Sequence, residues 1–312
     1  MDKDTFKNRI GKTTNPLPGS IPYSFTYTKA VKLKDNGKTI LDFYADAFPS
    51  KDKTEWKQRI DSGKVLVNDK KVAFNTILRA GWITKHTIDQ IVEPLVNPVI
   101  GFIYEDADIL VIDKPAPLPV HPSGRFIKNT VSSILKQAFP NQEYKIVHRL
   151  DANTTGLLVL AKNKAVANSL ITKFQKHQIH KTYLALVEGE LQKTDFNITL
   201  NIGTEKQKSG ARKLSITGKK ADTQVKVLKH LNGNTLVALQ PKSGKTNQLR
   251  LHLASIGHPI VGDLGYKNPD YFKTNPMTYS ADILMLHAWK LEFVLNNKPF
   301  VFVAEVPVKF GV

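Results

Sequence analysis

The spacing of apolar and polar residues divides the chain into helical and extended segments. Residues 164–176 place apolar side chains on one helical face, at Val166, Ala167, Leu170, Ile171 and Phe174. Short apolar runs that end at turn residues or prolines predict strands instead, as at 109–115, 156–161 and 182–189. Further strands are expected at 195–200, 222–229, 235–240 and 299–306, and further helices at 130–138 and 246–255. This mixture predicts an α+β fold in which a mainly antiparallel sheet is flanked by helices.

The first residues show neither helical nor strand periodicity. Pro16, Pro18, Gly19 and Pro22 lie there among polar residues, so we expect residues 1–37 to form an extended N-terminal arm. The 22 residues from Gly265 to Leu286 are also polar and rich in proline, which predicts a long surface loop.

Residues 38–97 have the pattern of a small α/β module. Two short helices are expected at ILDFYADAF, from Ile40, and at TEWKQRIDSG, where Thr54 can cap and Gly63 can end the helix. Two strands, KVLVND and KVAFNTIL, follow, and WITKHTIDQIV closes the module. Pro94 and Pro98 mark a linker, and residues 98–312 form the larger domain.

Composition narrows the possible functions. The chain has 312 residues, with 41% hydrophobic and 23% charged residues, which is enough for roughly two folded domains. Its net charge of +18 makes nucleic acid the first candidate partner. The absence of cysteine excludes disulfides, thiolate nucleophiles and cysteine-bearing zinc sites. No apolar run approaches the length of a membrane-spanning helix and the start lacks the form of a signal peptide, so we expect a cytoplasmic protein.

The segment VHRLDANTTG holds one carboxylate, Asp151, in a polar turn between two apolar strands. An acid in a turn is commonly a structural residue that accepts hydrogen bonds from the following backbone, with His148 and Arg149 as structural groups. The alternative is that this carboxylate does chemistry. The segment alone favours the structural interpretation.

The segment PKSGKTNQLRLHLASIGHPIVGD, at 241–263, contains a glycine turn before a helix. SGKT suggests a phosphate-binding loop, but Leu239 stands where that motif requires its first glycine, so the motif is rejected. Arg250 lies at the edge of the apolar face of the expected helix, from which it can reach a neighbouring loop. A solvated surface arginine is the alternative.

Together these segments resemble the RluA-type pseudouridine synthases in order and spacing. HRLD, TTGLLVLAK, KTYLALVEG, GKTNQLRLHLASIGHPIVGD and LHAWKLEF carry the likeness, and YEDADILVIDKPAPLPVHP resembles the opening motif of the same domain. The match covers roughly residues 100–308. The resemblance implies that Asp151 is the catalytic aspartate, that Tyr183 contacts the uracil and could act as a base, and that Arg250 is the partner of the aspartate.

The resemblance also implies RNA contacts. Arg149 resembles the arginine that, in some relatives, fills the gap left by an extruded base. Lys245 and Asn247 stand where arginine and histidine are commoner, and Ala152 and Asn153 replace residues that are often arginine and aspartate. These departures concern phosphate or loop contacts, with Lys245 as a candidate RNA-binding residue, and leave the three implied catalytic residues intact.

Residues 38–97 resemble, more weakly, the small RNA-binding module of ribosomal and RNA-modifying proteins in which two helices precede a β-ribbon. WKQRIDSGKVLVNDKKV carries the likeness, although the usual openings of both helices are replaced. If the likeness holds, candidate phosphate contacts are Lys57, Arg59, Lys64, Lys70 and Lys71. An ordinary solvated lysine-rich face is the alternative.

A basic run at 202–229 has eight lysines and arginines against two acids, and it includes Arg212 and Lys213 as further candidates for RNA contact. The alternative is a solvated insertion loop. The nine histidines show no paired metal-ligand spacing, so neither a metal nor another cofactor is expected.

We therefore expect a cofactor-free, monomeric RNA pseudouridine synthase that acts on structured RNA, with large-subunit ribosomal RNA as the first candidate. Transfer RNA is the alternative substrate. A non-catalytic RNA-binding ribosome-assembly factor on the same fold is the alternative of a different class. The sequence leaves open whether Asp151 attacks the ribose, stabilises charge there or takes a proton.

Overall fold

The computed structural model describes residues 1–49, 51–203, 205, 212–267 and 284–311. The chain divides into two compact units, one of Gly19–Glu93 and one of Met1–Pro18 with Pro94–Val312. Parts of the basic run and most of the expected 265–286 loop lie outside the described residues.

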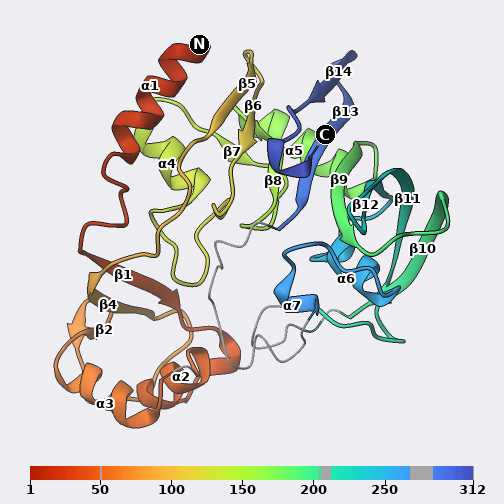
Figure 1. The fold of residues 1–312 in the computed structure, drawn as a ribbon. Coiled ribbons are helices and arrows are strands. Elements are labelled where there is room, and N and C mark those ends of the chain that lie inside the picture. Colours follow the sequence, from red (N-terminus) through yellow and green to blue (C-terminus); the bar gives the residue numbers. More distant parts are fainter. Residues whose placement is uncertain (50, 204, 206–211, 268–283, 312) are drawn as a thin grey trace. The chain divides into compact units, whose positions relative to one another are not determined.

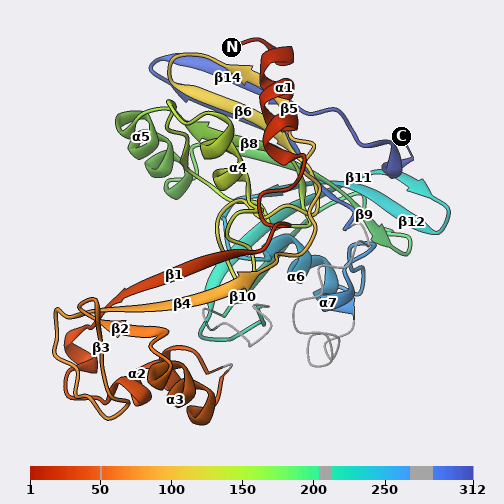
Figure 2. The ribbon, with the colours of Figure 1, turned by 90° about the vertical axis from the view of Figure 1, so that its left-hand side faces the viewer.

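The smaller unit is a four-stranded antiparallel sheet with the order β1-β4-β2-β3 and with two helices packed on it. Its strands are β1 (Tyr23–Ala30), β2 (Val65–Val67), β3 (Lys70–Lys71) and β4 (Ile83–Ile91). The two packed helices are α2 (Ile40–Ala47) and α3 (Lys53–Asp61), and a short 3-10 helix, η1 (Leu33–Asp35), precedes them. Figure 2 shows β1 and β4 as a long paired ribbon. The core is aromatic and aliphatic, with Tyr44, Trp56 and Ile60 almost fully buried.

Two local predictions for this unit were wrong. The second helix is capped by Asp52, whose carboxylate accepts the Glu55 N–H at 2.7 Å, rather than by Thr54. Of the expected strand KVAFNTIL, only Lys71 lies in a strand, at the end of β3, and the chain then leaves the sheet to place Leu78 in the core.

The extended arm expected for residues 1–37 was also wrong. Residues Lys3–Thr14 form helix α1, which Asp2 caps by accepting the Thr5 N–H at 2.8 Å. Phe6 and Ile10, one helical turn apart, are buried against α4 (Val131–Ala138) and β5 (Gly101–Glu105), as Figure 1 shows. After Pro22 the chain enters β1, so the two parts of this segment belong to different units.

The larger unit is a mixed, mainly antiparallel sheet with the order β10-β11-β12-β9-β13-β8-β6-β5, to which β14 and β7 add at the side (Figure 1). Its strands beyond β5 are β6 (Ile109–Lys114), β7 (Lys145–Ile146), β8 (Thr155–Ala161), β9 (His180–Glu188), β10 (Asp195–Ile202), β11 (Lys219–Leu231), β12 (Asn234–Pro241), β13 (Leu286–Leu295) and β14 (Lys298–Val303). β8 and β13 run parallel where they meet, and the other neighbours are antiparallel.

Helices cover both faces of this sheet. They are α1, α4, α5 (Lys164–Gln175), α6 (Gln248–Ser255), the short α7 (Leu264–Lys267) and the 3-10 helix η2 (Val308–Phe310). Because side chains alternate along a strand, β8 is buried on both sides: Leu158 and Leu160 join the core under α1 and α4, while Leu157 and Val159 join the core under α5. Among the described residues, no helix is long and apolar enough to span a membrane.

Candidate active site

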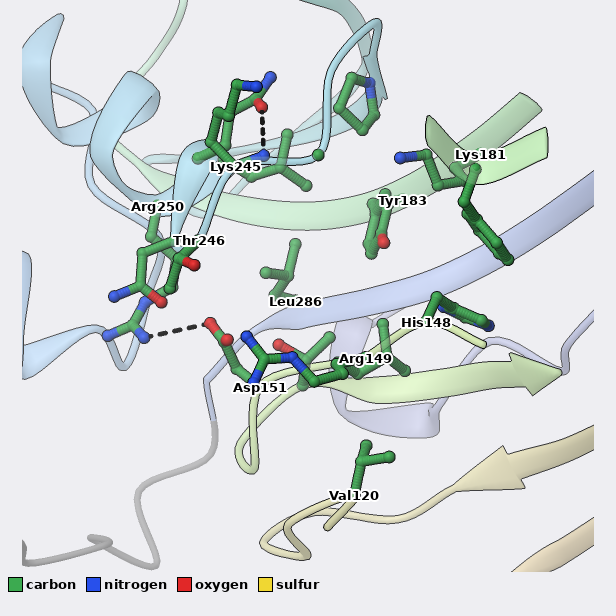
Figure 3. A pocket seen from close by; sticks show the side chains of 18 of the residues that line it. Val120, His148, Arg149, Asp151, Lys181, Tyr183, Lys245, Thr246, Arg250 and Leu286 are labelled. Carbon is green, nitrogen blue, oxygen red and sulfur yellow. Dashed lines mark hydrogen bonds and ion pairs between the residues drawn. The ribbon is translucent and has the colours of Figure 1, made fainter. Parts of the chain in front are cut away.

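A cavity of about 890 Å³ lies in the larger unit where the strand ends of the sheet meet three loops. The implied catalytic residues Asp151, Tyr183 and Arg250 all line it, although they come from separate segments of the sequence. Figure 3 shows these side chains around the same space, with Arg149 and Lys245 also on its border. The fold therefore brings together the three residues that the resemblance singles out.

The loop that carries Asp151 is fixed from below by buried polar contacts. Lys114, a fully buried residue at the end of β6, donates to the carbonyl oxygens of Ala152, Leu118 and Pro115. The Ala152 carbonyl also accepts the Leu118 N–H at 2.9 Å, and the Asp151 carbonyl accepts the Thr154 N–H at 3.1 Å. These bonds hold the backbone from Asp151 to Thr154, while the Asp151 side chain lines the cavity.

Gly156 allows this loop to lie directly against β13. Its φ is +109°, and a Cβ placed there would lie 2.3 Å from the Ala288 carbonyl oxygen. The residue pairs with Ala288 in the short parallel contact between β8 and β13. A side chain at this position would push the Asp151 loop away from β13.

Arg250 connects the cavity to a buried carboxylate. Its Nε and Nη2 donate to the two oxygens of Asp263, at 2.7 and 2.8 Å, and its Nη1 lies 3.4 Å from Oδ2 of Asp151. The Asp263 side chain is 1% exposed and that of Asp151 is 36% exposed. Burial disfavours the charged guanidinium, but the hydrogen bonds and charge of Asp263, followed by the charge of Asp151, raise the pKa of Arg250 above its ordinary value. Arg250 is therefore a fixed cation beside Asp151.

The ring of Tyr183 extends from β9 and lines the cavity (Figure 3). Burial, and then the negative charge of Asp151, raise the pKa of the Tyr183 phenol well above its ordinary value. The phenol is accordingly protonated at neutral pH. Its ring offers a surface on which a planar base can stack.

The loop between β12 and α6 forms the rim of the cavity, and Gln248 organises it. The Gln248 side-chain oxygen accepts the Ser243 hydroxyl at 2.7 Å and the Lys245 N–H at 3.1 Å. Its amide nitrogen donates to the Asp222 carbonyl and to Thr223, both at 3.0 Å. The expected helix therefore begins at Gln248 rather than at Thr246, after Asn247 in a left-handed conformation.

Neighbouring residues of the Asp151 segment have different environments. His148 is half-buried at the cavity wall and stacks on Phe174 with ring centroids 4.4 Å apart, and its Nε2 accepts the Val159 N–H at 3.0 Å. Arg149 is exposed, and its Nη1 lies 3.3 Å from Nε2 of His121. His148 is thus part of the packing, whereas Arg149 is available at the mouth of the cavity.

The other predicted RNA-binding residues lie outside the cavity. In the smaller unit, Lys57, Arg59 and Lys64 each face a carboxylate, of Asp61, Glu55 and Asp89 respectively. Lys70 and Lys71 are exposed on β3 and form no ion pair with any residue that the structure describes. In the larger unit, Lys213 is exposed, and the backbone N–H of Arg212 donates to the Tyr266 hydroxyl at 3.0 Å.

Sequence reasoning missed four residues of this site. Asp263 holds Arg250, the Tyr266 ring lies under the Arg250 guanidinium at 5.0 Å, Lys114 fixes the Asp151 loop, and Lys181 lines the cavity. Asp263 and Lys114 lie in the quoted motifs GHPIVGD and ILVIDKP, so a signal was present. It showed which segments matter, but not which side chains meet in the fold.

Comparison with known proteins agrees with this geometry. Residues 108–255 match the family described as RNA pseudouridylate synthase. The chain is 33% identical to the ribosomal large subunit pseudouridine synthase D of Borreliella burgdorferi, over 69% of this chain and 67% of that protein. It is 30% identical to the mitochondrial tRNA pseudouridine(32) synthase of Saccharomyces cerevisiae, over 83% of this chain and 57% of that protein.

A solved structure is also similar. Human RNA pseudouridylate synthase domain containing 1 superposes with a TM-score of 0.55 and 28% identity, over 66% of this chain and 83% of that one. The chain belongs to the RNA pseudouridylate synthase family, in its RluA-type branch. It spans about half the length of several curated relatives that it matches.

Proposed function

We propose that this protein isomerises specific uridines in RNA to pseudouridine. The observation that carries the proposal is the Asp151 carboxylate, held beside Arg250 and near the ring of Tyr183, in a cavity of a chain that belongs to this family. The reaction breaks the bond between N1 of uracil and C1′ of ribose, turns the base, and joins C5 to C1′. C5 loses its proton and the freed N1 gains one, so the product is an isomer of the substrate. The reaction needs no redox partner and no energy input.

Asp151 is the group placed to act at C1′. Its carboxylate is partly open to the cavity and lies 3.4 Å from the Arg250 guanidinium, and a carboxylate at this position can attack C1′ or stabilise positive charge there. Both roles resemble carboxylate chemistry in glycoside cleavage. Arg250, fixed by Asp263, holds one carboxylate oxygen and leaves the other free for the ribose.

Tyr183 holds the base during the turn. Because its phenol is protonated at neutral pH, we assign it to stacking and hydrogen bonding rather than to removal of the C5 proton. The target base is out of reach in a stacked helix, so the RNA must extrude it, at a cost of a few kcal/mol. The exposed Arg149, at the mouth of the cavity, is placed to fill the gap that remains.

The substrate proposal follows the relatives. One relative is named for large-subunit ribosomal RNA, and we propose that RNA as the first candidate. Another, which matches a larger share of this chain, is named for tRNA and makes transfer RNA the second candidate. We further propose that the enzyme acts as a cytoplasmic monomer and that the smaller unit contributes RNA contacts through Lys70 and Lys71.

The test compares pseudouridine maps of total RNA, by carbodiimide adduct stops in reverse transcription, from cells with and without the gene. We expect at least one stop that the wild-type gene restores and that Asp151→Asn does not. Asp195→Asn, at an exposed carboxylate on β10, is the matched control and should restore the stop. If Asp151→Asn restores modification, the assignment of the aspartate is wrong. If purified wild-type protein also modifies no ribosomal or transfer RNA transcript, the non-catalytic assembly role replaces the enzyme.

A further inference from the structure

The cavity contains one sheltered cation that the reaction at C1′ does not use. Lys181 lies two residues before Tyr183 on β9, so the two side chains extend from the same face of the strand. Figure 3 shows Lys181 and His148 toward one end of the cavity and the Asp151–Arg250 pair toward the other, with Tyr183 between them in this view. Lys181 is therefore displaced from the reacting atoms.

The surroundings of Lys181 provide no counter-charge. Among the residues that the structure describes, none forms an ion pair or hydrogen bond with its ammonium group. The His148 ring, which also lines the cavity, is uncharged at neutral pH, because burial and then the charge of Lys181 lower the pKa of His148 to about 3. Burial also lowers the pKa of the Lys181 ammonium itself. A sheltered ammonium without an anion costs free energy that a bound anion would offset.

The rim loop adds the elements of an anion site. The Lys181 Nζ lies 3.7 Å from the position that a Cβ on Gly244 would occupy, so the ammonium approaches the loop backbone where no side chain intervenes. Lys245, the next residue of this loop, also lines the cavity, and its ammonium forms no ion pair within the described part of the chain. The cavity is thus lined by two lysines without ion pairs among the described residues, and one of them, Lys181, approaches the loop at the exposed Gly244.

We propose that Lys181, together with Lys245 and the backbone at Gly244, binds a phosphate of the RNA backbone adjacent to the extruded uridine. The inference rests on the proposed function for the identity of the ligand as RNA, whose anionic groups are its phosphates. The contact orients the nucleotide from the side opposite Asp151, so that C1′ faces the carboxylate. Lys181 is a binding and positioning residue in this assignment, and it does not touch the reacting atoms.

The experiment measures whether the effect of Lys181 on RNA binding depends on one particular phosphate. Each phosphate on either side of the target uridine is replaced, one at a time, by a neutral methylphosphonate, and binding is measured with Asp151→Asn protein to prevent turnover. In Asp151→Asn protein that keeps Lys181, replacement of one of these phosphates should weaken binding about tenfold. In protein that also carries Lys181→Met, the same replacement should have little further effect. Lys181→Arg should keep most of the sensitivity, because it keeps the charge.

Salt dependence provides a second readout. Lys181→Met should reduce the slope of log affinity against log salt by about 0.7 to 0.9, the value for one phosphate contact. The matched control is Lys290→Met, at a lysine on β13 that pairs with Glu292 at 2.9 Å outside the cavity, and it should leave the slope and the phosphate sensitivity unchanged. Thermal unfolding of each variant checks that the fold is retained.

Two outcomes would overturn the assignment. If no phosphate couples to Lys181, the site is not a phosphate site. If Lys181→Met instead removes discrimination between uridine and cytidine at the target position, with an unchanged salt slope, the ammonium contacts the base. Failure of the proposed function is separate, since it appears as wild-type protein that forms no pseudouridine in any RNA, whereas the coupling is measured by binding.

Discussion

A single guanidinium, that of Arg250, joins two carboxylates of very different exposure. Asp263 is almost fully buried and takes two of its hydrogen bonds, while Asp151 is open to the cavity and receives the third and longest, at 3.4 Å. The short contacts fix the position of the arginine, and the long one leaves the Asp151 carboxylate free to move toward a ribose. Arg250 can be anchored by Asp263 and still contact the reacting Asp151 because the guanidinium is planar and forked.

Arg250→Lys tests this division. Lysine keeps the charge but cannot contact both Asp263 oxygens and Asp151 at once, so we expect the single-turnover rate of pseudouridine formation to fall about a hundredfold. RNA affinity should change by less than about threefold, because the local charge is retained. Arg79→Lys, in the smaller unit, is the control and should keep the wild-type rate. A rate for Arg250→Lys within about twofold of wild type would show that the fork is not required.

The sequence predicted the residues of this site that lie in recognisable motifs, but not the residues that reach it only through the fold. The motif resemblance predicted Asp151, Tyr183 and Arg250, and all three line one cavity. Asp263 lies 13 residues after Arg250, a separation with no characteristic contact in a helix or strand, and they meet because the chain turns back after α6. Lys114 and Lys181 look like ordinary strand-end lysines until the fold surrounds them.

At the level of secondary-structure elements, the contact between β8 and β13 places the Asp151 loop. Gly156 has no space for a side chain, since a Cβ would lie 2.3 Å from the Ala288 carbonyl oxygen. We expect Gly156→Ala to lower the free energy of unfolding by about 3 kcal/mol or more and to reduce activity in the protein that remains folded. Urea denaturation and single-turnover assays measure the two effects.

Gly11→Ala is the matched control for that substitution. Gly11 lies in α1 with nothing within 4 Å of a Cβ, so alanine should stabilise the helix by about 0.5 to 1 kcal/mol without changing activity. Similar losses of stability in both variants would mean that the close approach to β13 is not the cause.

Helix α1 shows how a short amphipathic element escapes detection. Only Phe6 and Ile10 of its twelve residues are buried, and two apolar positions do not establish a helical period. The helix exists because those two side chains dock on the core formed by α4 and β5 and because Asp2 caps it. The same dependence on tertiary contacts explains why β3 is so short, since nothing in KVAFNTIL reveals where pairing ends.

Phe6→Ala should remove much of this docking. The Phe6 ring is fully buried and contacts Phe102 and Phe139 with ring centroids 5.4 and 5.5 Å apart. We expect a loss of about 3 to 4 kcal/mol in the free energy of unfolding of the larger unit, measured by urea denaturation. Lys7→Ala, at an exposed neighbouring position, should stay within about 0.5 kcal/mol of wild type. An equally small change for Phe6→Ala would indicate that α1 is not part of the cooperative fold.

Across the whole molecule, the positive charges that are free to contact RNA are not spread evenly between the two units. Residues 19–93 hold 13 basic and 9 acidic residues, and most lysines there face a carboxylate. The rest of the chain carries most of the net charge of +18. The sequence gives the net charge of the chain, but only the structure separates paired from unpaired cations. Electrostatic affinity for RNA should therefore come mainly from the larger unit.

The stability of both units should depend on pH, because both units bury neutral histidines. Burial lowers the pKa of His86 in the smaller unit, with help from the Arg59 and Lys51 charges, to about 4. Burial likewise lowers the pKa of His148 to about 3 and those of His252 and His287 to about 4. In the unfolded chain these imidazoles have the ordinary value of 6.5. Between that value and about pH 4, the unfolded state binds protons that the folded state excludes, so stability falls as the pH falls.

His148→Gln isolates one of these contributions. The Nε2 of His148 accepts the Val159 N–H and cannot do so when protonated, whereas a glutamine oxygen can accept that bond at any pH. Each such histidine lowers the free energy of unfolding by at most about 1.4 kcal/mol per pH unit below 6.5. Urea denaturation at several pH values from 7 to 4.5 should therefore give a shallower loss for His148→Gln than for wild type. His180→Gln, at an exposed histidine on β9, should follow the wild-type curve. Parallel curves for wild type and His148→Gln would place the acid sensitivity in other groups.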